Sequence, residues 1–219
     1  MVYKILFEIE ISVALICLLA SITIFFQSTS ELYLKLFPFY FLFGIITESI
    51  GEYTAAHNRN NTILLNIYSV LEFAFYFFVL NQVIRNKRIK KIAIWVLCLY
   101  LLYSTLNFFL VPSIFNSVAY SISCLFLVGF CIYYFVEIFQ LPQTGSLWRQ
   151  SSFWICTAIL FSYCCTFPVF AFIVFFHEPP KIIMSNLAGI IRITNIFTYS
   201  LYTIAFLCRI KTSKSMLSS

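Results

Sequence analysis

Long hydrophobic runs follow one another along almost the whole chain, and short polar segments separate them. We place the runs at residues 5–27, 33–55, 62–83, 92–111, 115–139, 152–176 and 183–208. A helix of about 20 mostly apolar residues crosses a hydrocarbon core of about 30 Å. The pattern therefore predicts an all-α polytopic membrane protein, with seven transmembrane helices that form a single domain over residues 1–219.

The composition agrees with a membrane protein and narrows the range of functions. Hydrophobic residues make up 62% of the chain and charged residues 10%, against about a quarter charged in soluble domains. The loops are too short to hold a separate catalytic or nucleic-acid-binding domain. We therefore expect function to reside inside the helix bundle or at its rims, with no nucleic-acid partner.

The cysteines and the N-terminus add no further chemistry. All eight cysteines fall inside the predicted helices, without the CxxC or Cys/His spacing of metal and redox sites. We interpret them as small packing residues and expect no metal and no cofactor. Lys4 is followed by Glu8 and Glu10, unlike the positive start of a signal peptide, so we expect the first run to be a retained helix.

The basic residues outside the runs are distributed unequally between the two sides of the membrane. One side has three, namely Lys4, Arg59 and Lys181. The other side has ten, namely Lys35, Arg85, Lys87, Arg88, Lys90, Lys91, Arg149, Arg209, Lys211 and Lys214. Because cytoplasmic loops carry the excess of Lys and Arg, we expect the N-terminus outside and a short cytoplasmic tail at 209–219. The expected location is the cell inner (plasma) membrane.

Half of the cytoplasmic bases form one cluster between the third and fourth runs. The cluster consists of Arg85, Lys87, Arg88, Lys90 and Lys91. We interpret it first as an anchor that fixes the topology; the alternative is a docking patch for anionic lipid or a cytoplasmic partner protein. We keep both interpretations.

A few charged residues lie within the runs themselves, where a charge costs about 2.5–3.5 kcal/mol on insertion scales. Glu8, Glu10 and Glu137 are close enough to a helix end to reach the interface. Glu48 and Glu72 are deeper, as is Arg192. At 1.5 Å per residue, Glu72 and Arg192 each lie about 15 Å from the outer end of their helices. Such residues persist mainly where they face protein or water.

Each of these three deep charges shares a helix face with small or polar residues. We therefore expect the three faces to meet in the outer half of the bundle. The candidate ligand-binding residues are Glu48, Glu52, Asn66, Tyr68, Glu72, Arg192, Asn195 and Tyr199.

Two interpretations of this polar group remain open. In one, Arg192 pairs with a Glu, with Glu48 or Glu72 as the expected partner, and the cluster only fixes helix packing. In the other, the residues line a pocket that opens to the outside. Two or three carboxylates would then face one arginine, and an uncompensated carboxylate must be protonated or attract a cation. Such a pocket suits an amine-bearing ligand, a cation or proton coupling.

Several of these residues also belong to short motifs. Glu48 with Tyr53, Asn66-Ile67-Tyr68 with Glu72 and Tyr76, and Phe153-Trp154-Ile155 with Pro168 resemble an uncharacterised family of small bacterial integral membrane proteins with seven transmembrane helices. The resemblance covers nearly the whole chain. It implies the topology and the recurrence of these polar positions, and it implies no activity.

Three classes of function compete at this point. A sensor or receptor-like module would bind a ligand in the outer pocket and signal through a cytoplasmic or membrane partner protein. A small transporter or channel would carry a cationic or amine-bearing solute. Against an enzyme, His57 and His177 lie at the outer boundary and no Ser or Cys has an adjacent base. A retinal pigment would need a lysine within a helix, which is absent. We expect a sensor rather than an enzyme.

Overall fold

The computed structural model describes residues 2–27, 31–57, 59–111, 114–140, 146–175 and 181–217. Within these ranges the chain is helical, with no strand. Seven of the helices are long and apolar enough to cross a membrane, which makes this a multi-pass membrane protein. The elements are α1 (Val2–Ile22), η1 (Thr23–Phe26), α2 (Leu32–Ala56), α3 (Thr62–Val83), α4 (Lys87–Leu110), α5 (Ser117–Gln140), η2 (Leu147–Arg149), α6 (Ser151–Phe175) and α7 (Lys181–Leu217).

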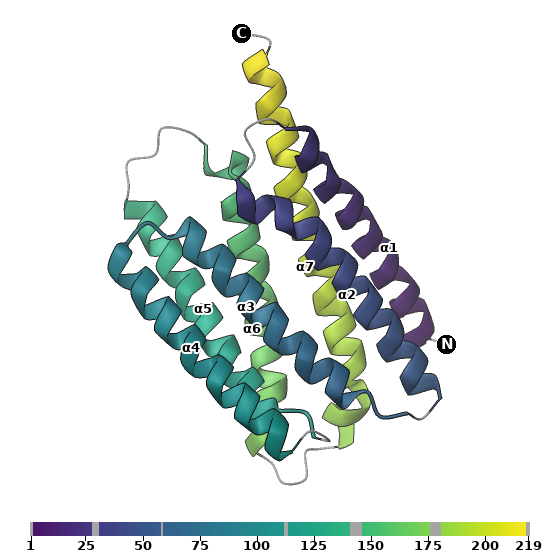
Figure 1. The fold of residues 1–219 in the computed structure, drawn as a ribbon. Coiled ribbons are helices and arrows are strands. Elements are labelled where there is room, and N and C mark those ends of the chain that lie inside the picture. The colour runs from purple at the N-terminus through teal and green to yellow at the C-terminus, as the bar shows by residue number, and fades with distance from the viewer. Residues whose placement is uncertain are drawn as a thin grey trace.

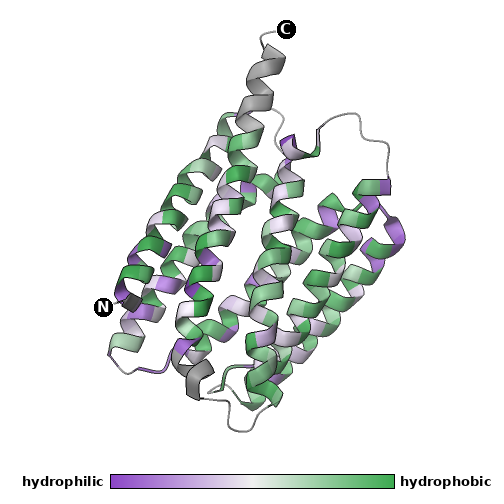
Figure 2. Ribbon diagram, turned by 180° about the vertical axis from the view of Figure 1, so that it is seen from behind, coloured by the Kyte–Doolittle hydropathy of each residue, from purple (hydrophilic) through white to green (hydrophobic). Residues whose placement is uncertain are grey.

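The helices form an elongated bundle whose chain termini lie at opposite ends (Figure 1). α1 packs against α2 and α7, and α7 continues the contact to α6, which packs against α5. α4 forms the opposite edge of the bundle and packs only against α3 and α5 among the described elements. Figure 2 shows hydrophobic residues over most of each helix, with hydrophilic residues mainly near the helix ends and in the loops.

Two helices differ from the bounds that hydropathy suggested. α4 begins at Lys87 rather than at 92, and α7 continues as a helix to Leu217 rather than ending at 208. The basic cluster therefore belongs largely to the first turns of α4. A hydropathy pattern detects only the apolar part of a helix, whereas local hydrogen bonds extend both helices into polar sequence. The side chain of Asn86 caps α4 by accepting a hydrogen bond from the backbone N–H of Arg88.

Glu137 has a structural role that its position near a helix end did not indicate. Its carboxylate accepts hydrogen bonds from the backbone N–H groups of Arg85 (2.8 Å) and Asn86 (2.9 Å). α5 therefore holds the connection between α3 and α4 in place. None of the five basic side chains of the cluster forms an ion pair within the described residues.

A layer of buried aromatic side chains fills the bundle between α2 and α7. Phe37 is completely buried, and its ring centroid lies 5.5 Å from those of Phe41 and Tyr202 and 5.6 Å from that of Phe206. We call these four residues the aromatic layer. Tyr202 of this layer also lines a cavity that lies toward the other end of the bundle.

Candidate functional site

A cavity of about 470 Å³ lies among α2, α3, α5, α6 and α7. Its lining comes from the ends of α2 and α6 and from the beginnings of α3, α5 and α7, so it lies toward the end of the bundle where the chain begins (Figure 1). No Cα atom of α2 lies within 8 Å of one in α7 among the described residues. Only side chains span this gap. The volume is within the usual range of small-molecule sites, roughly 300–1,000 Å³.

Glu72 of α3 is held in this cavity by a group of tyrosines. The Tyr40 hydroxyl donates a hydrogen bond to Glu72 Oε1 at 2.9 Å. The same hydroxyl lies 2.8 Å from that of Tyr76 and 3.5 Å from that of Tyr68. Since a tyrosine hydroxyl has one proton to donate, Tyr76 donates to Tyr40 while Tyr40 donates to Glu72. The carboxylate thus ends a short chain of hydroxyl groups.

Glu48 of α2 faces the same cavity with one oxygen bonded and one not. Its Oε1 accepts a hydrogen bond from the Tyr199 hydroxyl of α7 at 2.8 Å. Its Oε2 is buried and has no hydrogen-bond partner among the described residues. Gly44, one turn earlier, leaves room for two hydroxyls: a Cβ there would lie 3.4 Å from the Tyr68 hydroxyl and 3.6 Å from that of Tyr199.

The charges of the cavity are not balanced by bases. Glu48 and Glu72 both line it, and the described lining contains no Lys, Arg or His. The remaining polar lining consists of hydroxyl groups and the amide of Asn195. A buried carboxylate without a cationic partner must be protonated or attract a cation. The cavity can therefore hold either protonated carboxylic acids or a cationic guest.

Arg192 does not pair with Glu48 or Glu72, and that part of the sequence interpretation is wrong. Its Nη2 donates to Glu52 Oε2 of α2, and its Nη1 lies 3.7 Å from Glu10 Oε2 of α1. The reason is geometric, because helix side chains lean toward the N-terminus of their own helix. Arg192 therefore leans toward the end of the bundle where α2 ends, and it reaches Glu52, one turn beyond Glu48.

We call Arg192, Glu52 and Glu10 the ion cluster. Glu10 is the member that the sequence did not predict. It was assigned to the interface, but its side chain is only 4% exposed, compared with 14% for Arg192 and 41% for Glu52. A signal existed in the sequence, because Glu10 shares a face of α1 with Ala14 and Cys17, which are both fully buried. That face of small residues packs against α7, so the carboxylate on it is buried as well.

Asn195 connects the ion cluster to the cavity. It lines the cavity, and its Nδ2 donates a hydrogen bond to Glu10 Oε1 at 2.7 Å. Arg192 and Glu52 do not line the cavity. Of the eight residues proposed from the sequence, five surround the cavity: Glu48, Tyr68, Glu72, Asn195 and Tyr199.

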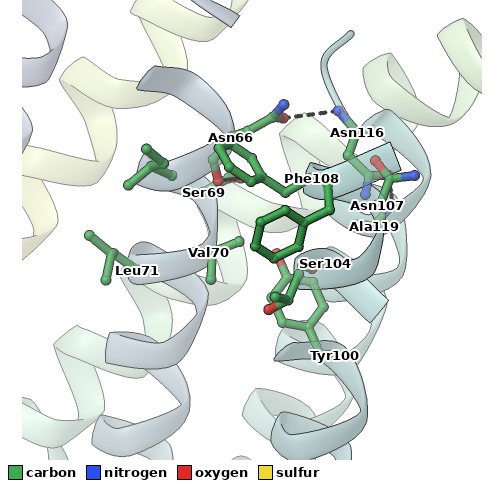
Figure 3. Close-up of a pocket in the computed structure, with 13 residues that line it drawn as sticks. Asn66, Ser69, Val70, Leu71, Tyr100, Ser104, Asn107, Phe108, Asn116 and Ala119 are labelled. Atoms are coloured by element: carbon green, nitrogen blue, oxygen red, sulfur yellow. Dashed lines mark hydrogen bonds between the residues drawn. The ribbon is translucent and has the colours of Figure 1, made fainter. Parts of the chain in front are cut away.

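Asn66 lies on a different side of α3 from the cavity. Its side chain donates to the carbonyl of Ile114 and accepts from the backbone N–H of Asn116, both at 3.0 Å (Figure 3). It precedes Tyr68 by two residues, which is about 200° around a helix of 3.6 residues per turn. Asn66 therefore links α3 to the segment before α5, because its side-chain amide bonds a backbone carbonyl and a backbone N–H of that segment.

Tyr40 was also missed, although its spacing indicated the site. It stands four residues before Gly44 and eight before Glu48, so the three share one face of α2. Tyr120 of α5 and Tyr202 of α7 complete the aromatic lining. Tyrosines are so common in this chain, with 14 in all, that only the packing of the helices distinguishes these from interfacial ones.

Comparison of the chain with protein-family models, curated proteins and solved structures gives no match. The chemistry of the site therefore rests on its own geometry.

Proposed function

We propose that the protein is a sensor or receptor-like module of a bacterial inner membrane, within the small seven-helix family that its motifs resemble. It binds a cationic, amine-bearing solute in the cavity of Glu48 and Glu72 and signals through a cytoplasmic or membrane partner protein. The main support for this proposal is a pair of carboxylates in a tyrosine-lined cavity whose described lining has no basic residue.

The chemistry of the lining favours an ammonium group over a bare metal ion. Tyrosine rings attract cations over their faces, with about 0.5–2 kcal/mol for each such contact. The free Glu48 Oε2 provides an acceptor for an N–H donor, and a hydrogen bond to a charged group contributes about 1.5–3 kcal/mol. Aromatic faces and a carboxylate together bind an organic cation.

The packing supports a sensor more than an open channel. Phe37, Phe41 and Phe206 lie on the side of the cavity toward the beginning of α2. They are buried and in mutual contact, so the polar lining does not continue to the other end. The Tyr199–Glu48 hydrogen bond is a side-chain bridge between α2 and α7. A ligand that binds Glu48 competes for this bridge, and its binding energy can change the separation of the two helices.

The output surface in this proposal is the basic cluster of residues 85–91. With the N-terminus outside, this cluster faces the cytoplasm, where five unpaired bases suit an acidic partner surface or anionic lipid. Glu72 is part of α3, and the C-terminal end of α3 leads directly into the connection with the basic cluster. The movement of α3 is therefore the proposed link from ligand to partner.

The first test measures binding of n-butylamine and tetramethylammonium to the purified protein by calorimetry. Glu48→Gln and Glu72→Gln should each weaken n-butylamine binding about tenfold or more, because a hydrogen bond to a charged acceptor, of about 1.5–3 kcal/mol, is lost. Tetramethylammonium has no N–H donor, so its binding should weaken only through the lost charge attraction. Glu52→Gln is the matched control, since this carboxylate lies outside the cavity and should leave the affinity unchanged. Equal affinities in all four proteins would contradict the proposal.

A second measurement separates the sensor from the alternative, a small transporter or channel. Radiolabelled amine is offered to proteoliposomes that contain the protein. A sensor binds the amine without accumulating it, whereas uptake that Glu72→Gln abolishes would identify a transporter. In cells, neutralising Arg85, Lys87, Arg88, Lys90 and Lys91 should remove the response to the amine while membrane insertion continues.

A further inference from the structure

A second pocket, of about 260 Å³, lies between α3, α4 and α5. Most of its lining surface is apolar, although six of its thirteen lining residues are Asn, Ser or Thr. Figure 3 shows Val70 on α3 beside Phe108 and Tyr100 of α4, and Leu71 on the outer side of α3. We call it the lateral pocket. It is distinct from the cavity of Glu48 and Glu72, and the function proposed above does not use it.

The lateral pocket opens toward the lipid. Ile67 and Leu71 on α3 and Phe109 on α4 contribute to its lining and are exposed large hydrophobic residues within membrane-spanning helices. α4 is the edge helix and packs only against α3 and α5 among the described elements. The seam between α3 and α4 is therefore accessible from the hydrocarbon core of the membrane.

The lateral pocket is also adjacent to the cavity. Ser69 of α3 lines both, and Glu72 follows it by three residues, one turn of the same helix. The Ser69 hydroxyl donates to the backbone carbonyl of Asn66 at 2.9 Å. It therefore lies along its own helix, and Ser69 is the residue that the two linings have in common.

A buried hydroxyl lies inside the lateral pocket. Ser104 of α4 is 6% exposed and lines the pocket, and its Oγ has no hydrogen-bond partner among the described residues (Figure 3). A buried polar group without a partner costs about 1–3 kcal/mol. An alkyl chain fits the apolar part of this lining, and it would leave the Ser104 hydroxyl as it is.

We propose that the ligand is an amphiphilic amine that enters from the bilayer between α3 and α4. Its ammonium group lies in the cavity beside Glu72 and Glu48, and its alkyl chain lies in the lateral pocket. Ser69 marks the crossing point between the two parts. This inference rests on the proposed function and names the substrate class of the same site.

The test compares dodecylamine with n-butylamine in lipid nanodiscs. Val70→Trp and Thr105→Trp each fill the lateral pocket, and Thr105 is already exposed, so its variant carries little folding risk. Each variant should weaken dodecylamine binding about tenfold and leave n-butylamine binding unchanged. Leu102→Trp, on an exposed position of α4 outside the lateral pocket, is the matched control. Comparison within one lipid composition removes the effect of amine partitioning.

A labelling experiment locates the chain directly. Dodecylamine with a diazirine at the end of the alkyl chain should label peptides from α3 and α4, and Val70→Trp should reduce that labelling. Labelling of α6 and α7, or equal labelling of all lipid-facing helices, would overturn the inference. If n-butylamine binds through Glu48 and Glu72 but the pocket-filling variants leave dodecylamine unaffected, the inference fails and the proposed function stands. If neither amine binds, both fail.

Discussion

Arg192 is bound by two carboxylates from two other helices, and their exposure differs tenfold. Glu10 is 4% exposed, whereas Glu52 is 41% exposed and can be solvated. Loss of the arginine therefore affects the two acids differently. Glu52 can turn to water, but Glu10 would keep a desolvated charge between α1 and α7. At the scale of single residues, the ion pair of Arg192 with Glu10 links the first and last helices at the ion cluster.

Arg192→Ala should destabilise the protein by about 3–5 kcal/mol, because removal of one member of a buried pair leaves the other charge unpaired. Glu10→Gln in the same chain should recover part of this loss, since glutamine is neutral and its carbonyl still accepts the hydrogen bond from Asn195. Thermal unfolding in detergent measures both effects.

Two controls sharpen this comparison. Arg149→Ala removes an exposed base without a described ion pair and should change stability by less than about 0.5 kcal/mol. Glu72→Gln combined with Arg192→Ala should give no recovery, since Glu72 lies in the cavity apart from the ion cluster. Recovery by Glu72→Gln but not by Glu10→Gln would show that the contacts of Arg192 are assigned to the wrong helices.

Single residues were predictable where helix periodicity was sufficient. Tyr68 and Glu72, four residues apart, share a face that points into the cavity. Periodicity does not specify which neighbour a face meets, and a long side chain such as Arg192 can reach several. For the same reason Glu10 was assigned to the interface: its distance from the helix end was estimated, but the packing of α1 on α7 was unknown.

At the scale of elements, the connection between α3 and α4 forms a corner with a high density of positive charge. Among the described residues, Glu137 is the one acidic side chain that contacts it. The basic side chains at the start of α4 are unfavourable there, because the helix dipole is positive at an N-terminus. The Glu137 carboxylate of α5 offsets this by accepting two backbone N–H groups. The position of the basic cluster therefore depends on one residue of another helix.

Glu137→Ala should loosen this corner without unfolding the bundle. Two hydrogen bonds to a charged acceptor are lost, and each contributes about 1.5–3 kcal/mol when intact. Amide hydrogen exchange at Arg85 and Asn86 should accelerate at least tenfold, while exchange in α6 and α7 stays the same.

Glu31→Gln provides the comparison for that experiment. Glu31 is the acidic residue before α2, and its side chain makes no capping hydrogen bond, so exchange near residues 85–91 should not change. Equal acceleration in both variants would indicate a general electrostatic effect in place of a specific anchor.

The elements themselves were largely predictable, and their ends were not. Each of the seven membrane-spanning helices corresponds to one hydrophobic run, because a backbone in lipid must satisfy its hydrogen bonds within the helix. The start of α4 at Lys87 and the continuation of α7 to Leu217 depend on local capping and on helix propensity in polar sequence. A hydropathy average does not contain that information.

At the scale of the whole molecule, an odd number of membrane-spanning helices separates the two termini. The cavity lies at the end of the bundle that contains His57, and α7 carries the chain to the opposite end (Figure 1). Which end faces the cytoplasm is an expectation from the ten-to-three distribution of bases. The same distribution determines toward which side of the membrane the cavity of Glu48 lies.

Cysteine labelling of intact cells with a membrane-impermeant maleimide tests this orientation. His57→Cys should be labelled from outside, and Lys214→Cys should be labelled only after the membrane is opened. The eight native cysteines fall within membrane-spanning runs, and the parent protein reports their background labelling. Labelling of position 214 alone in intact cells would reverse the topology and place the cavity toward the cytoplasm.

The aromatic layer also has a consequence for the electric field inside the protein. A cavity with carboxylates and hydroxyls is large and polar enough to hold water, and water conducts the potential of its own side into the bundle. The membrane voltage then falls mainly across the dry layer of Phe37, Phe41, Tyr202 and Phe206. A charge that crosses the whole membrane gains about 2.3 kcal/mol per 100 mV. If a cation binds at Glu48 as proposed, it crosses little of this field, and its affinity should be nearly independent of the voltage.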